Sequence, residues 1–484
     1  MPLQETINVH NLLNKLDWTI FTAILLLTLA TVVYSFIKQK KINKITTTNK
    51  NNLQLTEYLI MGRQLTLPLF VATLSSTWYG NIFGVAQIAF EHGVYNFITQ
   101  GLFWYASYIA FAIFFVKKIR KYNSLTLPDL IKNIFGEKSA KFSAILIFFK
   151  TLPITHTIGI AILLQLIFNI SFSLAAILGV CFVLIYSLFG GFRAVVLSDL
   201  IQCICMIVGI ISVVCFSYST FGGINFLITK LPPSHFSFSG NHNAATPFVW
   251  LLIACSTTFI NPAFYQRCFA AKSDKTAIYG ILCSLFIWII IDCCITAGGM
   301  YAFATIPKSQ PINAYLTYSM QILPNGWKGL FLAAVAATIL STLDSFLLIS
   351  ANTLFFDLPV LRNININVKH IYSLMLTSII TISLAIYYEG KIENVWLNFK
   401  SYFSACLLFP LIIGYYLPKK ISDNQFIIAC SAGCISFSLW GLFNRFYNTN
   451  IADQINSFYV GNLATLCIFF YYVYKNKQNN LLST

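Results

Sequence analysis

Long apolar stretches recur along the whole chain and are separated by short polar segments. Each stretch spans about 20 residues, which is the length that an α-helix needs to cross the hydrocarbon core of a lipid bilayer. The pattern therefore predicts an all-α polytopic membrane protein with about 13 transmembrane helices. The expected helices cover 18–38, 65–90, 96–117, 140–167, 172–189, 198–219, 247–270, 277–303, 328–352, 369–387, 394–416, 425–444 and 455–474.

Two of these spans carry polar and helix-loosening residues at mid-depth. The second span contains Ser75, Ser76, Thr77, Gly80, Asn81 and Gly84, and the seventh contains Ser256, Thr257, Thr258, Asn261 and Pro262. Because lipid cannot satisfy a broken backbone, such interruptions are tolerated only beside protein or water. Each interrupted span begins a group of five, so the pattern favours a core of two inverted five-helix repeats with two broken helices.

The expected organisation is one transmembrane transporter domain over residues 1–484. Repeat one covers about 65–219 and repeat two about 247–416, with an additional helix at about 18–38 and additional helices at about 425–474. The loops between the spans are short. We therefore expect neither a soluble catalytic domain nor a regulatory one.

Composition supports the membrane interpretation, because the chain is 57% hydrophobic and only 10% charged, against about 25% charged residues in a soluble domain. The net charge of +16 does not indicate a nucleic-acid partner, because the basic residues gather on alternate loops. Lys38 and Lys40 follow the first span, and Lys117 and Lys118 follow the third. By the positive-inside rule, this asymmetry predicts an N-terminus outside and a C-terminus inside, in a plasma membrane such as a bacterial inner membrane.

Six short segments carry a resemblance to a known family. They are GGFRAVVLSDLIQ (Gly190–Gln202), on the expected loop between two spans, AATILSTLDS (Ala336–Ser345), TEYLIMGRQLTLP (Thr56–Pro68), SLTLPDLIKNIFG (Ser124–Gly136), NPAFYQRCFAAKSDKTA (Asn261–Ala277) and SANTLFFDL (Ser350–Leu358). By the order and spacing of these segments along the sequence, the chain resembles the sodium:solute symporter family over about residues 55–420. The resemblance implies the leucine-transporter fold, with ten core helices in two inverted repeats and with sodium as the co-transported ion.

The resemblance also implies a sodium site between the second and ninth spans. Ser341 and Thr342 would contribute hydroxyl oxygens, and Leu74, Thr77 and Thr338 would contribute backbone carbonyls. The chemistry agrees, because a dehydrated hard cation needs several oxygen ligands and residues three or four apart share one helix face. The alternative is that these hydroxyls only hydrogen-bond within their own helix or to a neighbour.

Candidate solute-binding residues flank the two interruptions. Asn81 and Asn261 are polar, lie at mid-depth and stand beside a Gly or a Pro. Trp78 and Phe259 are aromatic and either close over a solute or simply pack. Trp78 stands where the family usually has a Ser, so a further sodium contact at this position is not expected.

Ionisable residues inside spans cost roughly 2.5–3.5 kcal/mol at the helix centre and mark functional sites. Asp292 either binds a cationic or hydroxylated solute or neutralises Lys150. Asp344 either favours a cation near the hydroxyl pair or forms a structural pair. Asp199, expected at the membrane edge, is a candidate for a gating or scaffold ion pair with an inner-loop Arg or Lys. His156 is interpreted as an interior histidine rather than a proton relay.

The combined pattern favours a secondary active transporter that imports a small organic solute with sodium by alternating access. One alternative is a proton-coupled symporter or exchanger of the same fold, for which Asp292, Asp344 and His156 would supply titratable groups. A second alternative is a membrane enzyme or redox subunit. Only one of the 6 histidines lies inside a span, which makes a haem site with two histidine ligands improbable. The family carries sugars, amino acids, vitamins and carboxylates, so the resemblance selects neither the solute nor the stoichiometry.

Overall fold

The computed structural model of the chain describes residues 12–45, 50–240, 242, 246–358, 366–389, 395, 401–447 and 457–482. These residues form helices and connecting turns, and the one β-bridge among them joins Leu65 to Ala271. In this part of the chain, 9 helical segments are long and apolar enough to cross a membrane, and shorter apolar helices accompany them. The all-α membrane fold is confirmed, whereas the number of spans stays a prediction. The predicted start of the eleventh span, residue 394, lies outside the described residues.

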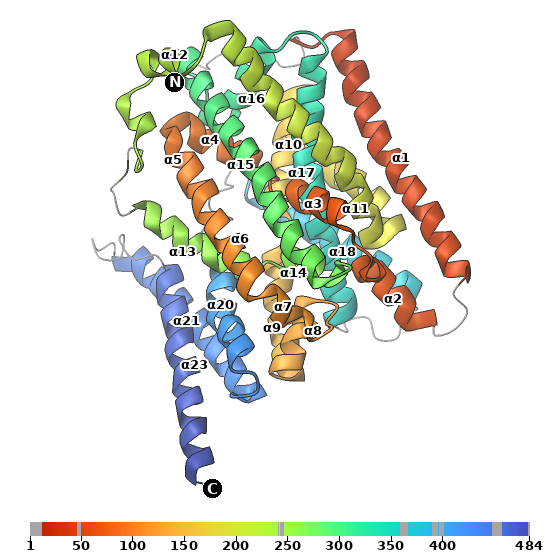
Figure 1. Cartoon of the computed structure of the whole chain (residues 1–484), viewed down its shortest axis with the longest axis vertical. Coiled ribbons are helices and arrows are strands. Elements are labelled where there is room, and N and C mark those ends of the chain that lie inside the picture. The colour runs from red at the N-terminus through yellow and green to blue at the C-terminus, as the bar shows by residue number, and fades with distance from the viewer. Residues whose placement is uncertain are drawn as a thin grey trace.

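The elements follow one another along the chain as shown in Figure 1. They are α1 (Lys15–Ile45), α2 (Lys50–Ile60), η2 (Met61–Arg63), α3 (Leu67–Ser76), α4 (Ile82–His92), α5 (Val94–Asn96), η3 (Phe97–Leu102), α6 (Phe103–Phe114), α7 (Val116–Arg120), α8 (Leu127–Ile134), α9 (Glu137–Thr151), α10 (Ile154–Phe168), α11 (Phe172–Phe221), α12 (Ile224–Lys230), η4 (Pro233–Phe236), α13 (Thr246–Phe259), α14 (Pro262–Ala270), α15 (Asp274–Thr305), α16 (Pro311–Ile322), α17 (Trp327–Asn352), η5 (Thr353–Asp357), α18 (Ile366–Tyr387), α20 (Ser401–Tyr416), α21 (Asp423–Tyr447) and α23 (Ser457–Leu482).

Helix α17 forms the centre of the molecule, and almost all of its residues are buried. It packs against α11, α1, α18 and α10. Four alanines near its middle, at 333, 334, 336 and 337, keep its surface small, so neighbouring backbones approach closely. Figure 1 shows α1 along one side of the molecule and α21 and α23 at the opposite lower corner.

Both predicted helix breaks are present. The second predicted span divides into α3 and α4, with Asn81 preceding α4 in a non-helical conformation (φ −108°, ψ 39°). The seventh divides into α13 and α14 at Asn261. Pro262 opens α14, where its missing N–H is not needed. Both interruptions therefore expose backbone groups inside the protein.

The Gly190–Gln202 segment does not form the expected loop. The residues on both sides of Gly191 are helical, and the non-helical backbone of Gly191 (φ 52°, ψ −154°) separates two helices within α11. Only glycine adopts this conformation easily, and a Cβ at Gly191 would lie 2.6 Å from the ring of Tyr58. The two spans therefore join directly at a kink.

The fourth predicted span has a break that the apolar pattern did not reveal. Helix α9 ends at Thr151 and α10 begins at Ile154. Between them, Leu152 is extended (φ −52°, ψ 124°). Pro153 accounts for the break, because proline disfavours the helical conformation in the residue before it and cannot donate to the helix.

The start of the first broken helix and the end of the second are joined through the backbone. Leu65 N donates to Ala270 O (2.9 Å), and Lys272 N donates to Leu65 O (3.0 Å). Nearby, the buried Arg193 and Glu57 pair at 2.5 Å and tie α2 to α11 just beyond its kink. Removing one partner of such a buried pair typically costs about 3–5 kcal/mol. These contacts hold the start of the first broken helix in place.

Helices α20 and α21 bring two thiols together. The Sγ atoms of Cys406 and Cys434 lie 2.9 Å apart, and both side chains are largely shielded from solvent. We expect mild oxidation of the intact protein to form a disulfide between them and to block both thiols against alkylation. Peptide mass spectrometry after oxidation measures this linkage.

The matched controls are single Cys→Ser variants. Cys406→Ser abolishes the linked peptide, whereas Cys467→Ser, at an exposed position on α23, leaves it unchanged. Failure of the wild-type protein to form the linkage would contradict the observed packing of α20 on α21.

Candidate functional site

The first break meets the middle of α17 through a cluster of buried oxygens. Ser341 Oγ lies 2.9 Å from the carbonyl oxygen of Ser76 and 3.1 Å from that of Thr338. Thr342 Oγ1 lies 3.1 Å from the carbonyl oxygen of Thr77 and 3.0 Å from that of Thr338. Two hydroxyls and three carbonyls therefore surround one small region, which is the ligand type that a hard cation requires.

Four of the five predicted sodium ligands meet in this cluster, namely Thr77, Thr338, Ser341 and Thr342. Leu74 is buried in α3, but the carbonyl facing Ser341 belongs to Ser76. The position of Ser76 at the end of α3 is the signal that could have identified it, because the last carbonyls of a helix lack helical partners.

Gly80 allows the break to approach α17 closely. A Cβ at this position would lie 2.5 Å from Thr342 Cβ and 2.7 Å from His156 Nδ1. Gly159 on α10 adds a second small residue, with its Cβ position 3.7 Å from the Gly80 carbonyl oxygen. His156 is buried and lies beside the break, as expected of an interior histidine.

Arg267 crosses from the second broken helix to the first, and its side chain is fully buried. One of its terminal nitrogens, Nη2, donates to the hydroxyls of Thr73 (2.9 Å), Thr77 (2.6 Å) and Ser345 (3.0 Å). The same nitrogen lies 3.6 Å from a carboxylate oxygen of Asp199, which also accepts from the Thr73 hydroxyl. Arg267 belongs to the Asn261–Ala277 segment of resemblance, but the sequence does not predict these contacts.

Arg267 bears on the predictions for two aspartates. Asp199 is completely buried, because α11 packs on α3, while its position at the membrane edge stays a prediction. Its partner is Arg267 of α14, and not an inner-loop residue. Asp344 is also fully buried on α17 and interacts electrostatically with Arg267. In their charged forms these three groups sum to one negative charge beside the oxygen cluster, which favours a cation there.

Trp78 lies within an aromatic cluster at the first break. Its ring centroid is 4.8 Å from that of Trp104, 5.2 Å from Tyr108 and 5.5 Å from Trp288. Phe259 packs elsewhere, 4.8 Å from the ring of Phe115. The rings of Trp78 and Phe259 are therefore not in direct contact, but a series of ring contacts through Tyr108, Phe264 and Phe111 connects them.

Asp292 is buried on α15 and accepts a hydrogen bond from the hydroxyl of Tyr105. Lys150 Nζ lies 3.0 Å from Ser404 Oγ on α20. No ion pair among the described residues joins Lys150 to Asp292. Lys150, the residue before the last one of α9, reaches α20, whereas Asp292 faces α6.

The two asparagines lie at equivalent places in the two breaks, each immediately before a helix. Asn261 Oδ1 accepts from Ala263 N (3.1 Å) and so caps α14. Asn81 precedes α4 without such a bond, and its side chain lies against Gly84. Asn81, Asn261 and Trp78 retain some exposed surface, whereas Phe259 and Asp292 are buried.

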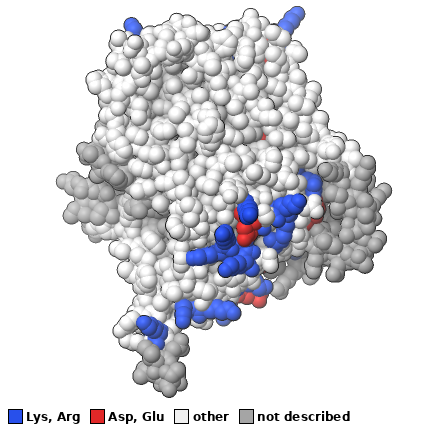
Figure 2. Space-filling view, in the orientation of Figure 1, with Lys and Arg blue, Asp and Glu red and all other residues white. Residues whose placement is uncertain are grey.

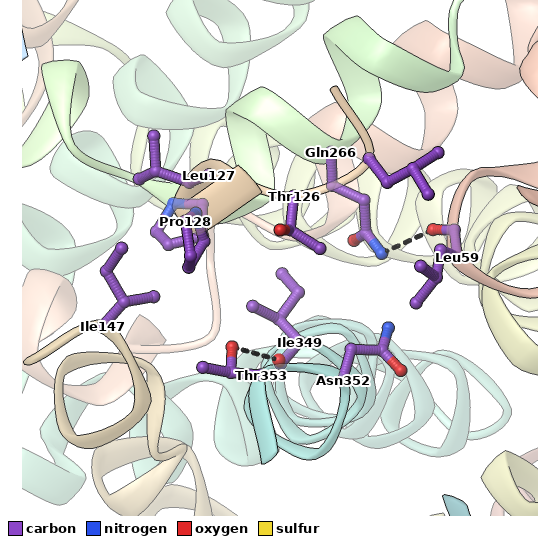
Figure 3. Close-up of a pocket in the computed structure, with 11 residues that line it drawn as sticks. Leu59, Thr126, Leu127, Pro128, Ile147, Gln266, Ile349, Asn352 and Thr353 are labelled. Atoms are coloured by element: carbon purple, nitrogen blue, oxygen red, sulfur yellow. Dashed lines mark hydrogen bonds between the residues drawn. The ribbon is translucent and has the colours of Figure 1, made fainter. Parts of the chain in front are cut away.

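A small pocket lined by both apolar and polar side chains reaches the second break at Pro262. Figure 3 shows Gln266, Asn352 and Thr126 around it, with Gln266 Nε2 donating to the Leu59 carbonyl oxygen. The pocket extends to residues 125–128, which follow the basic helix α7. It therefore connects the second break with the part of the molecule that carries this basic helix.

Comparisons with known proteins agree with this arrangement. The model of the sodium:solute symporter family matches residues 58–424. A sodium/pantothenate symporter of Haemophilus influenzae is 27% identical over 431 residues, covering 84% of this chain and 86% of that protein. The high-affinity choline transporter 1 of Drosophila melanogaster is 29% identical over 172 residues, 34% of this chain and 27% of that protein. A substrate-bound, outward-open structure of a Na⁺-coupled sialic acid symporter aligns with a TM-score of 0.76 at 14% identity, covering 94% and 97% of the two chains.

Substitution of Gly80 tests the contact between the break and α17. Gly80→Ala places a methyl group 2.5 Å from Thr342 Cβ, so the break must shift away from the oxygen cluster. Overpacking of this kind costs about 1–3 kcal/mol, which corresponds to a roughly tenfold weaker apparent affinity for sodium. The measurement is the sodium concentration that half-maximally stabilises the purified protein against heat.

Gly159→Ala is the matched control, because its nearest new contact is an ordinary 3.7 Å. It is expected to leave sodium affinity unchanged. Equal sodium affinities in both variants and the wild type would contradict the idea that Gly80 sets this contact.

Proposed function

We propose, because this chain belongs to the sodium:solute symporter family, that sodium bound between the first break and α17 drives import of a small organic solute by alternating access. The chain is a multi-pass membrane transporter and not an enzyme, and sodium is its co-transported ion. The observation that carries the proposed site is the cluster of two hydroxyls and three carbonyls at Ser341 and Thr342.

The proposed ligands are the hydroxyls of Ser341 and Thr342 and the carbonyls of Thr338 and Thr77, with a further carbonyl from Ser76 or Leu74. The hydroxyls now lie against these carbonyls at 2.9–3.1 Å. A sodium ion would replace these contacts and attract all five oxygens at once. Because it binds only while the break touches α17, sodium stabilises that arrangement over any other.

Arg267 would couple this site to the second broken helix. It extends from α14 to Thr77 of the first break and to Ser345 of α17. A change at the sodium site would therefore alter contacts made by α14. Asn261, at the N-terminal end of α14, is proposed to contact solute. Asn81 and Trp78 would contribute from the first break, and Phe259 and Asp292 would complete the candidate solute-binding set.

The membrane potential supplies part of the driving force. One charge that moves through 100 mV yields about 2.3 kcal/mol. This energy supports roughly 50-fold accumulation of solute for each sodium ion, because each 1.4 kcal/mol is a factor of ten. A sodium concentration gradient would add to this value.

The proposed repeats are 65–219 and 247–416, with the additional helices outside them. Each repeat would begin with one of the broken helices. We also propose that the N-terminus faces outside and the C-terminus inside. This orientation is supported by Figure 2, in which basic side chains on the visible face gather toward the end where the C-terminal helix finishes.

Removal of the two hydroxyls tests the sodium site. We expect Ser341→Ala with Thr342→Ala to abolish sodium-stimulated uptake in proteoliposomes at fixed pH. Each hydroxyl is expected to contribute roughly tenfold in sodium affinity, as a hydrogen-bonding group on a charge does at about 1.5–3 kcal/mol. Thr342→Ser keeps the oxygen and should retain most of the sodium response.

Ser350→Ala is the matched control, because it removes a buried hydroxyl of the same helix that bonds to Thr151 at 2.9 Å. It should transport with normal sodium dependence. An unchanged sodium dependence in the double variant would refute the proposed ligands. Uptake driven equally well by a proton gradient without sodium would instead support the proton-coupled alternative.

A further inference from the structure

We propose that the transported solute carries a positively charged amine or quaternary ammonium group, which binds between the ring of Trp78 and the carboxylate of Asp292. The inference rests on the proposed function, because it specifies the solute of the same site. It follows from the aromatic rings gathered at the first break and from the charge of Asp292.

Four aromatic side chains from three elements meet at the break. Trp78 belongs to the break itself, Trp104 and Tyr108 come from α6, and Trp288 comes from α15. The rings of Trp104 and Tyr108 meet that of Trp78 edge to face, at interplanar angles of 69° and 86°. The face of an aromatic ring attracts a cation, and groups of such rings bind quaternary ammonium ligands.

Burial makes this cluster suited to a cation that arrives without its water. Trp104, Tyr108 and Trp288 expose at most 3% of their surfaces, whereas Trp78 is partly exposed. The three buried rings hold Trp78 in place and keep the region apolar, so attraction between a cation and the exposed ring is stronger than at a wet surface. Trp78 is therefore the ring of this cluster that is available to a solute.

Asp292 lies one helical turn beyond Trp288, on the same face of α15. Tyr79, the neighbour of Trp78, donates through its hydroxyl to Trp288 O (3.0 Å) and also interacts with Asp292. The break thus brings two consecutive residues to the same stretch of α15. Trp78 contributes a ring, and the hydroxyl of Tyr79 lies close enough to Asp292 to interact with it.

In its ionised form, Asp292 calls for a cation. Its described partners are the hydroxyls of Tyr105 and Tyr79, which are neutral. None of the four ion pairs found among the described residues includes it. A buried carboxylate is costly unless a positive charge accompanies it. A cationic solute group would supply that charge when it binds.

The basic residues of the core are engaged elsewhere. The guanidinium of Arg267 donates to the hydroxyls of Thr73, Thr77 and Ser345. Lys150 donates to Ser404 on α20. A solute whose recognised group is a carboxylate would therefore meet the like charge of Asp292 at this place, without a described basic residue beside it.

Binding of small probes to the full-length protein in nanodiscs tests the proposal. The probes are tetramethylammonium, choline and pantothenate, each titrated in sodium and in potassium buffer while tryptophan fluorescence is recorded. We expect saturable changes with tetramethylammonium and choline that are stronger in sodium, and none with the pantothenate anion. Asp292→Asn should weaken binding of both cations roughly tenfold or more, as loss of about 1.4 kcal/mol would.

Two further comparisons separate recognition from folding. Trp78→Phe should weaken cation binding less than Trp78→Leu, because Phe keeps an aromatic face. Asp274→Asn removes an exposed carboxylate from the first turn of the same helix and should bind like the wild type. Sodium-dependent thermal stabilisation of each variant confirms that the protein is folded.

The outcomes distinguish this inference from the function on which it rests. Sodium stabilisation together with saturable binding of pantothenate, and with no response to the two cations, would overturn the cationic solute while leaving the sodium site intact. Equal cation affinity in the wild type, Asp292→Asn and Trp78→Leu would do the same. Absence of any sodium response in the wild type would instead overturn the proposed function.

Discussion

The arrangement of the core depends on the close contact between the unwound end of α3 and the middle of α17. Gly80 permits this contact, since even one methyl group there would collide with Thr342. The contact turns ordinary backbone carbonyls into a set of converging oxygens, and it does so without placing a carboxylate among them. Such a set exists only while two separate elements stay together, so its affinity for an ion depends on the conformation of the whole protein.

Arg267 extends this dependence to the second broken helix. A buried guanidinium is tolerated only when its donors are satisfied and its charge is compensated. Here the hydroxyls of Thr73 and Thr77 and the carboxylate of Asp199 provide both, and they come from α3, the break and α11. Because Arg267 also donates to Ser345 of α17, this one side chain links α14 to α3, the break, α11 and α17. Any rearrangement that separates α14 from α3 must find new partners for this charge.

Much of the fold could be predicted from the sequence, because the length of apolar runs and the polar interruptions follow directly from the physics of the bilayer. The resemblance to a motif led to Ser341 and Thr342, which do meet the first break, while their role as sodium ligands stays a prediction. The site was not predicted where the answer depended on tertiary geometry. A difference between Leu74 and Ser76 at the end of α3 leaves no trace in periodicity. The opposite charges of Lys150 and Asp292 say nothing about which way their helices face. The Gly190–Gly191 pair is typical of a loop, although it also permits a sharp kink.

The backbone bridge at Leu65 has a consequence for how the two broken helices move. Two hydrogen bonds join the start of the first broken helix to the end of the second, and Arg267 links the same two helices deeper in the protein. Segments α3 and α14 are thus joined at two levels, so a tilt of one must either break these bonds or carry the other with it. In the proposed transport cycle, this would couple movement at the first break to movement at the second.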